Sequence, residues 1–334
     1  MRLTRRMIVI AATVAVALSG VITFGAPSNA EELKKVTVRL AFSYNGHRSP
    51  YLLGVDKGFY KEAGLDVEVL EGKGVTSSMQ LVAAQQDTFA IIDPPSLMLG
   101  VAQGMPIKQV AQLYQTSPNA LISWPEQNIK EPADLVGKKV ATLQGDMTTT
   151  MLYALLAKNG IDSSKVQIIA SDGGTRNQTF LAKRTEAITG FPNDSLLSLS
   201  DAAEVKLNHF TYASFGVDTM GDGIAAHTET VENSPEIVAA FVKATLRAYD
   251  YALQNPEESI DALLKRSPSR KKAVEVEKLK ATAALLHAKG SEGDTVGFSV
   301  KERWEATQAL MKEFGGLNTT VEDVTTYYTN DFIH

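Results

Sequence analysis

The sequence predicts an α/β protein with two lobes, each built on a mainly parallel sheet flanked by helices. Short β-like runs alternate with helical patterns along most of the chain, and they form two series separated by Trp124-Pro125-Glu126. The roughly 300 residues after position 30 also exceed the usual size of a single domain. Two crossings between the lobes, near residues 121–128 and 213–222, are therefore expected to form a hinge.

The first series begins with a strand in which Val36, Val38, Leu40 and Phe42 alternate with other residues, followed by a polar loop over residues 43–49. The pattern then predicts a helix over 50–63, strand 66–70, helix 76–86, strand 89–93, helix 95–103 and strand 107–113. This density of short elements is typical of βαβ winding.

The second series predicts strand 139–143, helix 148–159, and strands 166–169 and 187–189, and it ends where glycines interrupt the apolar pattern at 213–223. The remaining residues are mostly helical: Ser234-Pro235 opens a long helix to Gln254, and Asn255-Pro256 opens another. No internal repeat is apparent. We expect a discontinuous first lobe at 31–124 and 218–334, with the second lobe at 125–217 inserted between its two parts.

Residues 1–30 have the pattern of a cleaved secretory signal peptide. Arg2, Arg5 and Arg6 precede an apolar run over residues 8–24, and small residues stand at 28 and 30, where a signal peptidase reads the chain. A retained membrane anchor is the alternative, because the run approaches the length of a bilayer span. The export pattern favours cleavage after Ala30.

Composition excludes several classes of protein. Removing residues 1–30 takes away three arginines and no acidic residue, which moves the net charge from −5 to −8 and argues against nucleic-acid or anionic-membrane binding. The chain has no cysteine, which excludes disulfides, thiol catalysis and zinc–thiolate sites, as well as a lipid-modified cysteine at the mature N-terminus. We expect a freely diffusing, monomeric protein of the periplasm.

No catalytic, metal-binding or cofactor motif is found. Walker A, His-Glu-x-x-His and Gly-x-Ser-x-Gly patterns are absent, and the five histidines lack metal-ligand spacing. Gly72-Lys73-Gly74 lacks the third glycine of a dinucleotide fingerprint. It predicts either a tight turn that presents the N–H groups of Val75 and Thr76 to a ligand, or a plain strand-to-helix turn.

Several segments resemble the NMT1/THI5-like family of solute-binding proteins from ABC importers. Phe42-Ser-Tyr-Asn-Gly-His47 and residues 51–69 are similar to the opening of that family, and residues 80–93, 103–106, 134–140 and 223–256 follow in the family's order. The resemblance implies a periplasmic-binding-protein fold with ligand enclosed between the lobes, and a permease in the inner membrane as partner. It leaves the ligand open, since the family binds thiamin-precursor pyrimidines, nitrate, alkylsulfonates, taurine and aromatic compounds.

Ligands of open α/β sheets bind beyond the carboxyl ends of the strands, so residues that follow strands are the candidates. They are Phe42, Tyr44, Asn45 and His47 after the first strand, Thr76 after the second, Asp93 after the third, Gln144 and Thr148 after strand 139–143, and Asn193 and Asp194 after strand 187–189. Phe42, Tyr44 and Phe191 could flank a flat ring.

Each candidate also has a structural interpretation. His47, with Asn45, matches the polar loop of the pyrimidine-binding branch, although this loop is one residue shorter; it could instead form a hydrogen bond within the loop. Asp93 could cap helix 95–103, and one carboxylate can serve both purposes. Gln144 and Thr148 fit a helix start, and Asn193-Asp194 fits a turn. Trp124 is expected to pack at the hinge.

The resulting hypothesis is a non-catalytic receptor for a small polar heterocycle such as a thiamin-precursor pyrimidine. Asp93 and Asp194 would suit ring amino donors and repel a bare anion. The alternative is a sulfonate, nitrate or aromatic carboxylate, held at the helix N-termini near Thr76 and Thr148 with Arg48 or Arg176. A pyrimidine-synthase-like enzyme is a third option that the resemblance implies, but that branch carries a cysteine-rich motif and this chain has no cysteine.

Overall fold

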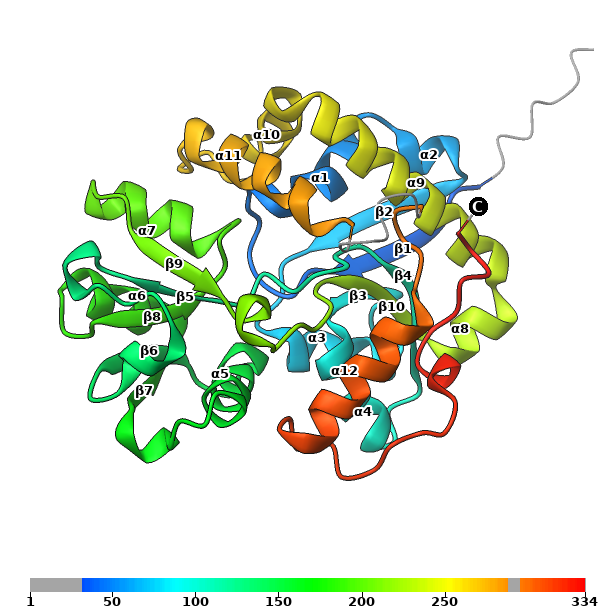
Figure 1. Cartoon of the computed structure of the whole chain (residues 1–334). Coiled ribbons are helices and arrows are strands. Elements are labelled where there is room, and N and C mark those ends of the chain that lie inside the picture. Colours follow the sequence, from blue (N-terminus) through cyan, green and yellow to red (C-terminus); the bar gives the residue numbers. More distant parts are fainter. Residues whose placement is uncertain (1–31, 288–294, 334) are drawn as a thin grey trace, which may run out of the picture. The chain divides into compact units, whose positions relative to one another are not determined.

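The first of two five-stranded sheets (Figure 1) contains, in spatial order, β2 (Leu65–Leu70), β1 (Lys34–Arg39), β3 (Phe89–Ile92), β10 (Gly223–His227) and β4 (Ile107–Gln112). Strand β1 is parallel to β2 and β3, whereas β10 is antiparallel to β3 and β4. All four residues of β3 and all five of β10 are buried. The sheet is therefore mixed, with a buried centre.

The computed structural model describes residues 32–287 and 295–333. The predicted signal peptide, residues 1–30, lies outside the described residues. Within them, none of the helices combines the length and the apolar character that crossing a bilayer requires.

The second sheet contains, in spatial order, β7 (Gln167–Ser171), β6 (Lys139–Leu143), β8 (Ala187–Gly190), β5 (Ala120–Ser123) and β9 (Asn208–Thr211). Here β6 is parallel to β7 and β8, and β5 is antiparallel to β8 and β9. The two sheets thus repeat one strand order and one set of directions. The sequence shows no matching repeat because a buried strand position constrains apolar character rather than residue identity.

In each sheet, the antiparallel strand is the one that the chain enters after crossing over from the other sheet: β10 in the first sheet and β5 in the second. The chain leaves the first sheet after β4 and enters the second at β5; it leaves the second after β9 and returns at β10. The first crossing therefore lies at 113–119, and residues 120–123 pair within the second sheet rather than belonging to a first lobe that extends to residue 124. Strand β5 has four buried residues without alternation, so periodicity could not reveal it.

Helices of the first lobe come from both ends of the chain (Figure 1). They are α1 (Ser49–Asp56), α2 (Phe59–Glu62), α3 (Val75–Ala83), α4 (Pro94–Ala102), α8 (Thr228–Asn233), α9 (Pro235–Gln254), α10 (Pro256–Leu264), α11 (Lys272–Thr282) and α12 (Lys301–Glu313), with 3-10 turns η1 (Gly46–Arg48), η6 (Ala283–Leu285) and η7 (Val324–Thr326). The single helix predicted over 50–63 is two helices, because Gly58 adopts a φ of 77° between them.

The second lobe contains α5 (Met147–Lys158), α6 (Gly173–Leu181) and α7 (Ser195–Ala203), with 3-10 turns η2 (Pro125–Gln127), η3 (Pro132–Leu135), η4 (Ser163–Lys165) and η5 (Ala213–Phe215). Trp124 stacks on Phe180 of α6 with ring centroids 5.0 Å apart, and the Lys183 ammonium lies 4.5 Å from the centre of its ring. Trp124 is thus a packing residue of this lobe.

Aromatic stacking anchors the long helix α9 on the first sheet. Phe241 of α9 stacks on Phe89 of β3, with ring centroids 4.1 Å apart. It also stacks on Tyr60 of α2, with ring centroids 5.5 Å apart. All three side chains are at most 1 % exposed. This packing holds α9 against β3, the strand that is followed by Asp93.

Candidate functional site: a cavity between two sheets

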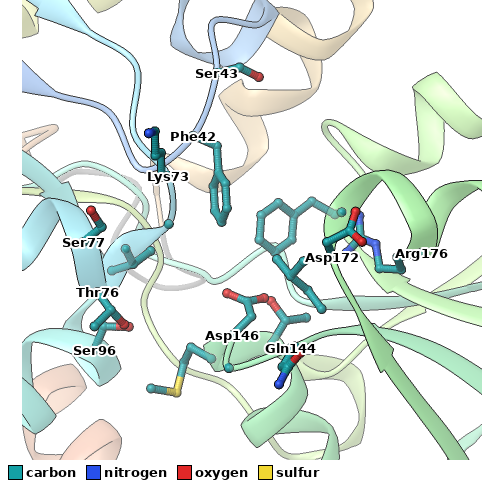
Figure 2. Close-up of a pocket in the computed structure, with 18 of the residues that line it drawn as sticks. Phe42, Ser43, Lys73, Thr76, Ser77, Ser96, Gln144, Asp146, Asp172 and Arg176 are labelled. Atoms are coloured by element: carbon teal, nitrogen blue, oxygen red, sulfur yellow. The ribbon is translucent and has the colours of Figure 1, made fainter.

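A cavity of about 900 Å³ is lined by residues that follow strands of both sheets (Figure 2). A second cavity of about 40 Å³ shares Phe42, Arg48, Thr148 and Phe191 with the first, and its wall includes the crossing segments at 117–119 and 219–222. The smaller cavity therefore lies between the larger one and the hinge.

Seven of the ten residues predicted from the sequence line these cavities. Phe42, Asn45, Thr76, Gln144, Thr148 and Asp194 line the larger one, and Asp93 lines the smaller one. Phe42 points into the cavity in Figure 2. The folded chain thus brings together residues that follow five strands, β1, β2, β3, β6 and β8, as the strand-end rule predicts.

Tyr44, His47 and Asn193 line neither cavity. The Tyr44 hydroxyl donates to the Val69 carbonyl oxygen at 2.6 Å, and its ring packs against the core of the first lobe. His47 is 2 % exposed, and Asn193 donates through Nδ2 to Thr282 Oγ1 at 3.3 Å. His47 Nδ1 is buried without a hydrogen-bond partner among the described residues, so the loop hydrogen bond of its structural interpretation is not seen at this atom, and Asn193 bonds to helix α11 rather than within its own turn.

The Gly72-Lys73-Gly74 turn fastens the start of α3 to the end of β1. Gly72 N donates to the Phe42 carbonyl oxygen at 3.2 Å, and Gly74 N donates to that of Ala41 at 2.8 Å. A Cβ at position 72 would collide with backbone carbonyl oxygens of Leu40 and Ala41, and Gly74 has a φ of 117°. The two glycines are needed for close approach and for backbone conformation, and the turn sets Thr76 at the cavity wall.

Asp93 is the N-cap of α4 and also faces the smaller cavity. Its carboxylate accepts hydrogen bonds from Ser96 N at 2.9 Å and from Ser96 Oγ at 2.8 Å. Burial, together with the nearby charges of Asp222 and Asp146, raises the pKa of Asp93 to about 6, although the bonds from Ser96 act in the opposite direction. A carboxylate with this pKa gains from a positively charged or donor group placed beside it.

The buried Arg48 pairs with the partly exposed Asp222 in the wall of the smaller cavity. Arg48 Nη2 lies 3.6 Å from Asp222 Oδ2, and the guanidinium carbon lies 5.8 Å from the centre of the Phe42 ring. Burial raises the pKa of Asp222, and Arg48 partly offsets this effect. Within the described residues, Arg48 Nε and the cavity-lining Asn45 Oδ1 are buried without a hydrogen-bond partner. Both atoms can therefore serve a ligand.

Asp194 lines the larger cavity and forms an ion pair with a residue of the first lobe. Its Oδ1 lies 2.9 Å from Lys278 Nζ of α11. Burial is the largest single influence and by itself would raise the pKa of Asp194, but the charge and hydrogen bond of Lys278, with His47 and Arg48, together outweigh burial, and the pKa lies below its ordinary value. Burial, reinforced by Arg48, lowers the pKa of nearby His47 to about 3, so this imidazole is neutral at neutral pH.

The cavity lining as a whole is acidic. Five carboxylates, Asp93, Asp146, Asp172, Asp194 and Asp222, face three cations, Arg48, Lys73 and Arg176. Sequence reasoning did not select Asp146, Asp172 or Asp222. Asp146 and Asp172 precede α5 and α6, where helix capping explains an aspartate equally well. In the described part of the chain, no group of three His, Asp or Glu side chains is arranged to hold a metal ion.

Comparison with known proteins adds to this geometry. The chain is 26 % identical over 239 residues to a formylaminopyrimidine-binding protein of Halalkalibacterium halodurans, covering 71 % of this chain and 72 % of that protein. It is 27 % identical over 320 residues to the riboflavin-binding protein RibY of Chloroflexus aurantiacus, covering 92 % and 88 %. A relative in Legionella pneumophila, 23 % identical over 70 % of this chain and 74 % of that protein, is named 4-amino-5-hydroxymethyl-2-methylpyrimidine phosphate synthase.

Among solved structures, the alkanesulfonate-binding protein SsuA from Xanthomonas axonopodis pv. citri, bound to MOPS, superimposes with a TM-score of 0.68 at 15 % identity, covering 90 % of this chain and 99 % of that one. This likeness shows that the chain has the two-lobed periplasmic-binding-protein fold, with two mixed sheets flanked by helices. The sequence model of the family described as NMT1/THI5 like matches residues 45–259, which is more than half of the chain. This protein belongs to the NMT1/THI5-like family.

Proposed function

We propose that this protein is the solute-binding component of an ABC importer, that it captures a small nitrogen heterocycle between its lobes, and that it delivers this ligand to an inner-membrane permease. The observation that carries the proposal is the combined lining of the two cavities, which contains the Phe42 ring together with the partly buried carboxylates Asp93, Asp146, Asp194 and Asp222. A flat ring can lie against the phenyl face while its N–H donors bond to carboxylate oxygens. Export to the periplasm after cleavage at Ala30 is part of the proposal.

Two relatives support a heterocyclic ligand. One is named for a formylaminopyrimidine and one for riboflavin, and both of these ligands contain nitrogen heterocycles with ring or exocyclic donors. The volume of about 900 Å³ lies toward the upper end of the usual range for small-molecule sites, so it accommodates a ring that carries a substituent.

An anionic ligand is the second candidate. It is favoured by the buried Arg48, whose Nε has no hydrogen-bond partner among the described residues, and by the fold shared with a sulfonate-binding protein. Arg48 already pairs with Asp222, however, and Arg176 donates to Asn177 Oδ1 at 3.1 and 3.2 Å. The excess of carboxylates over cations disfavours a bare anion in this wall.

A binding role also accounts for the site better than an enzymatic one. One relative is named a synthase, but two others and the sulfonate-binding structure are named binding proteins. We propose lobes bounded by the crossings, with the first lobe at 32–113 and 220–333 and the second at 120–215. A ligand that contacts both lobes then stabilises the closed conformation by its differential affinity.

A thermal-shift panel tests this function. The mature protein is heated with 4-amino-5-hydroxymethyl-2-methylpyrimidine, riboflavin, an alkanesulfonate, nitrate and an aromatic carboxylate, each in separate wells. A ligand present at 100 times its Kd adds about 2.7 kcal/mol to the free energy of unfolding. That corresponds to a Tm increase of several degrees for a chain of this size. We expect the increase with one of the two heterocycles; an increase only with the sulfonate, nitrate or carboxylate would refute the proposed ligand class.

A further inference from the structure

Helix α11 belongs to the first lobe but reaches the second. It packs against η1 and α10 of the first lobe, and Gly46 N of η1 donates to the Glu275 carboxylate. Toward the second lobe, Lys278 Nζ lies 2.9 Å from Asp194 Oδ1 and Lys271 Nζ lies 2.7 Å from Asp201 Oδ2. The α11 surface is therefore a bridge between the two lobes.

The two ion pairs of this bridge differ in their surroundings. The side chain of Lys278 is 2 % exposed and that of Asp194 is 27 % exposed, whereas Lys271 is 71 % exposed and Asp201 is 35 % exposed. Exposed pairs contribute little to stability, while a buried charge that loses its partner is strongly unfavourable. Separation of the lobes thus affects mainly the Lys278–Asp194 pair.

Charge balance on α11 depends on Asp194. Lys278 Nζ also lies 3.0 Å from Glu275 Oε1, and that carboxylate accepts from Arg270 Nη1 at 3.1 Å. With Asp194 present, the cluster contains two cations and two carboxylates. Without it, one positive charge is left in excess around a fully buried ammonium. The same Asp194 carboxylate lines the ligand cavity.

We propose that Lys278 is a positioning residue that latches the lobes through Asp194, so that it holds this carboxylate at the cavity wall and favours closure before ligand binds. The inference rests on the proposed cleft-binding function. The free energy needed to close the lobes reduces the apparent affinity for a ligand. A latch that already populates the closed conformation therefore raises that affinity. Loss of the latch should lower affinity by about tenfold, within the usual range of conformational couplings.

The interlobe distance in the ligand-free protein tests the latch. The chain has no cysteine, so spin labels attach only at an introduced pair. Asp66→Cys on β2 and Gln167→Cys on β7 are suitable, because each residue is exposed and lies on an outer strand of its own sheet. Double electron–electron resonance measures the distance between the two spin labels in four proteins. Lys278 is intact in the first, and the others carry Lys278→Met, Lys278→Arg, or Lys271→Ala, which is the control at the exposed ion pair.

We expect Lys278→Met to shift or broaden the distance distribution, Lys278→Arg to restore it, and Lys271→Ala to leave it unchanged. If Lys278→Met does not fold, Asp194→Asn provides the same test, because Asp194 is the more exposed partner of this ion pair. Unchanged distributions in the charge-removing variants that fold would overturn the latch. Calorimetry with 4-amino-5-hydroxymethyl-2-methylpyrimidine then measures affinity. If the protein with Lys278 intact binds neither this probe nor riboflavin, the proposed function fails, while the ligand-free distances still decide the latch.

Discussion

Replacing Asp93 by asparagine is expected to lower the affinity for an aminopyrimidine by roughly 10- to 100-fold, because a hydrogen bond to a charged group contributes about 1.5–3 kcal/mol. The substitution removes the negative charge that a ring amino donor would meet in the smaller cavity. It preserves the helix cap, because the asparagine oxygen can still accept from Ser96 N, and asparagine is as good an N-cap as aspartate.

The same substitution should stabilise the folded protein at neutral pH. The pKa of Asp93 is about 6 in the folded protein, above its ordinary value of 3.8, so the folded state binds the proton more tightly than the unfolded state. The contribution of Asp93 to stability is therefore fully present below pH 4 and is lost as the pH rises through about 6. Asp93→Asn removes this loss, which is at most about 3 kcal/mol.

Urea unfolding at pH 4 and pH 7, together with calorimetric titration at pH 7, checks both effects. Asp323→Asn is the matched control. The Asp323 carboxylate accepts hydrogen bonds from Thr325 N and Oγ1, as that of Asp93 does from Ser96, but the pKa of Asp323 is lowered and it lines neither cavity. Wild-type affinity in Asp93→Asn, or equal stability changes in the two variants, would show that Asp93 serves only as a cap.

Replacing Phe42 by alanine should lower the affinity for a heterocycle by roughly 5- to 150-fold, since stacking of a base on an aromatic side chain contributes about 1–3 kcal/mol. Phe42 lines both cavities and is only half-buried, so its ring is available to a ligand. We therefore expect little change in the free energy of unfolding.

Phe42→Leu separates stacking from simple apolar contact, because leucine retains apolar volume but has no aromatic face. Affinity should fall in both variants, further in Phe42→Ala, while riboflavin or the aminopyrimidine still gives a thermal shift at high concentration. Full retention of affinity in Phe42→Ala would place the ring of the ligand elsewhere in the cavity.

Much of the fold follows from local patterns. Helices α9 and α10 begin at Pro235 and Pro256 as the sequence predicts, since proline after Ser234 or Asn255 marks a helix start without tertiary information. Strand β9 and helices α6 and α7 are absent from the predicted elements. Helix α6 is mostly polar, and both β9 and β5 have only four residues, too few for periodicity to identify.

The rule that ligands bind beyond the carboxyl ends of strands predicts part of the cavity lining from the sequence. It places Asp93, Gln144 and Thr148 at the cavities, but it overlooks Asp222, which stands at the amino end of β10. Because β10 is antiparallel to its neighbours, its amino end lies at the sheet edge where the other strands have their carboxyl ends. Direction in a mixed sheet depends on tertiary topology, which local periodicity does not contain.

Lys278 illustrates a second limit. In the sequence it stands in a helix rich in lysine and glutamate that has the character of a solvated surface helix. In the structure it is buried, and its ammonium pairs with Glu275 on the same helix and with Asp194 in the other lobe. A contact between residues 84 positions apart, across two lobes, becomes visible only in the folded chain.

The most direct test of the heterocycle hypothesis is to identify the molecule that the protein carries. The protein is purified from native periplasm without added ligand, denatured, and the released small molecules are identified by mass spectrometry. We predict a nitrogen heterocycle with amino or amide donors, released in near-stoichiometric amount and able to restore the Tm of the emptied, refolded protein. A sulfonate, nitrate or aromatic carboxylate that is released and restores the Tm in its place would contradict the account.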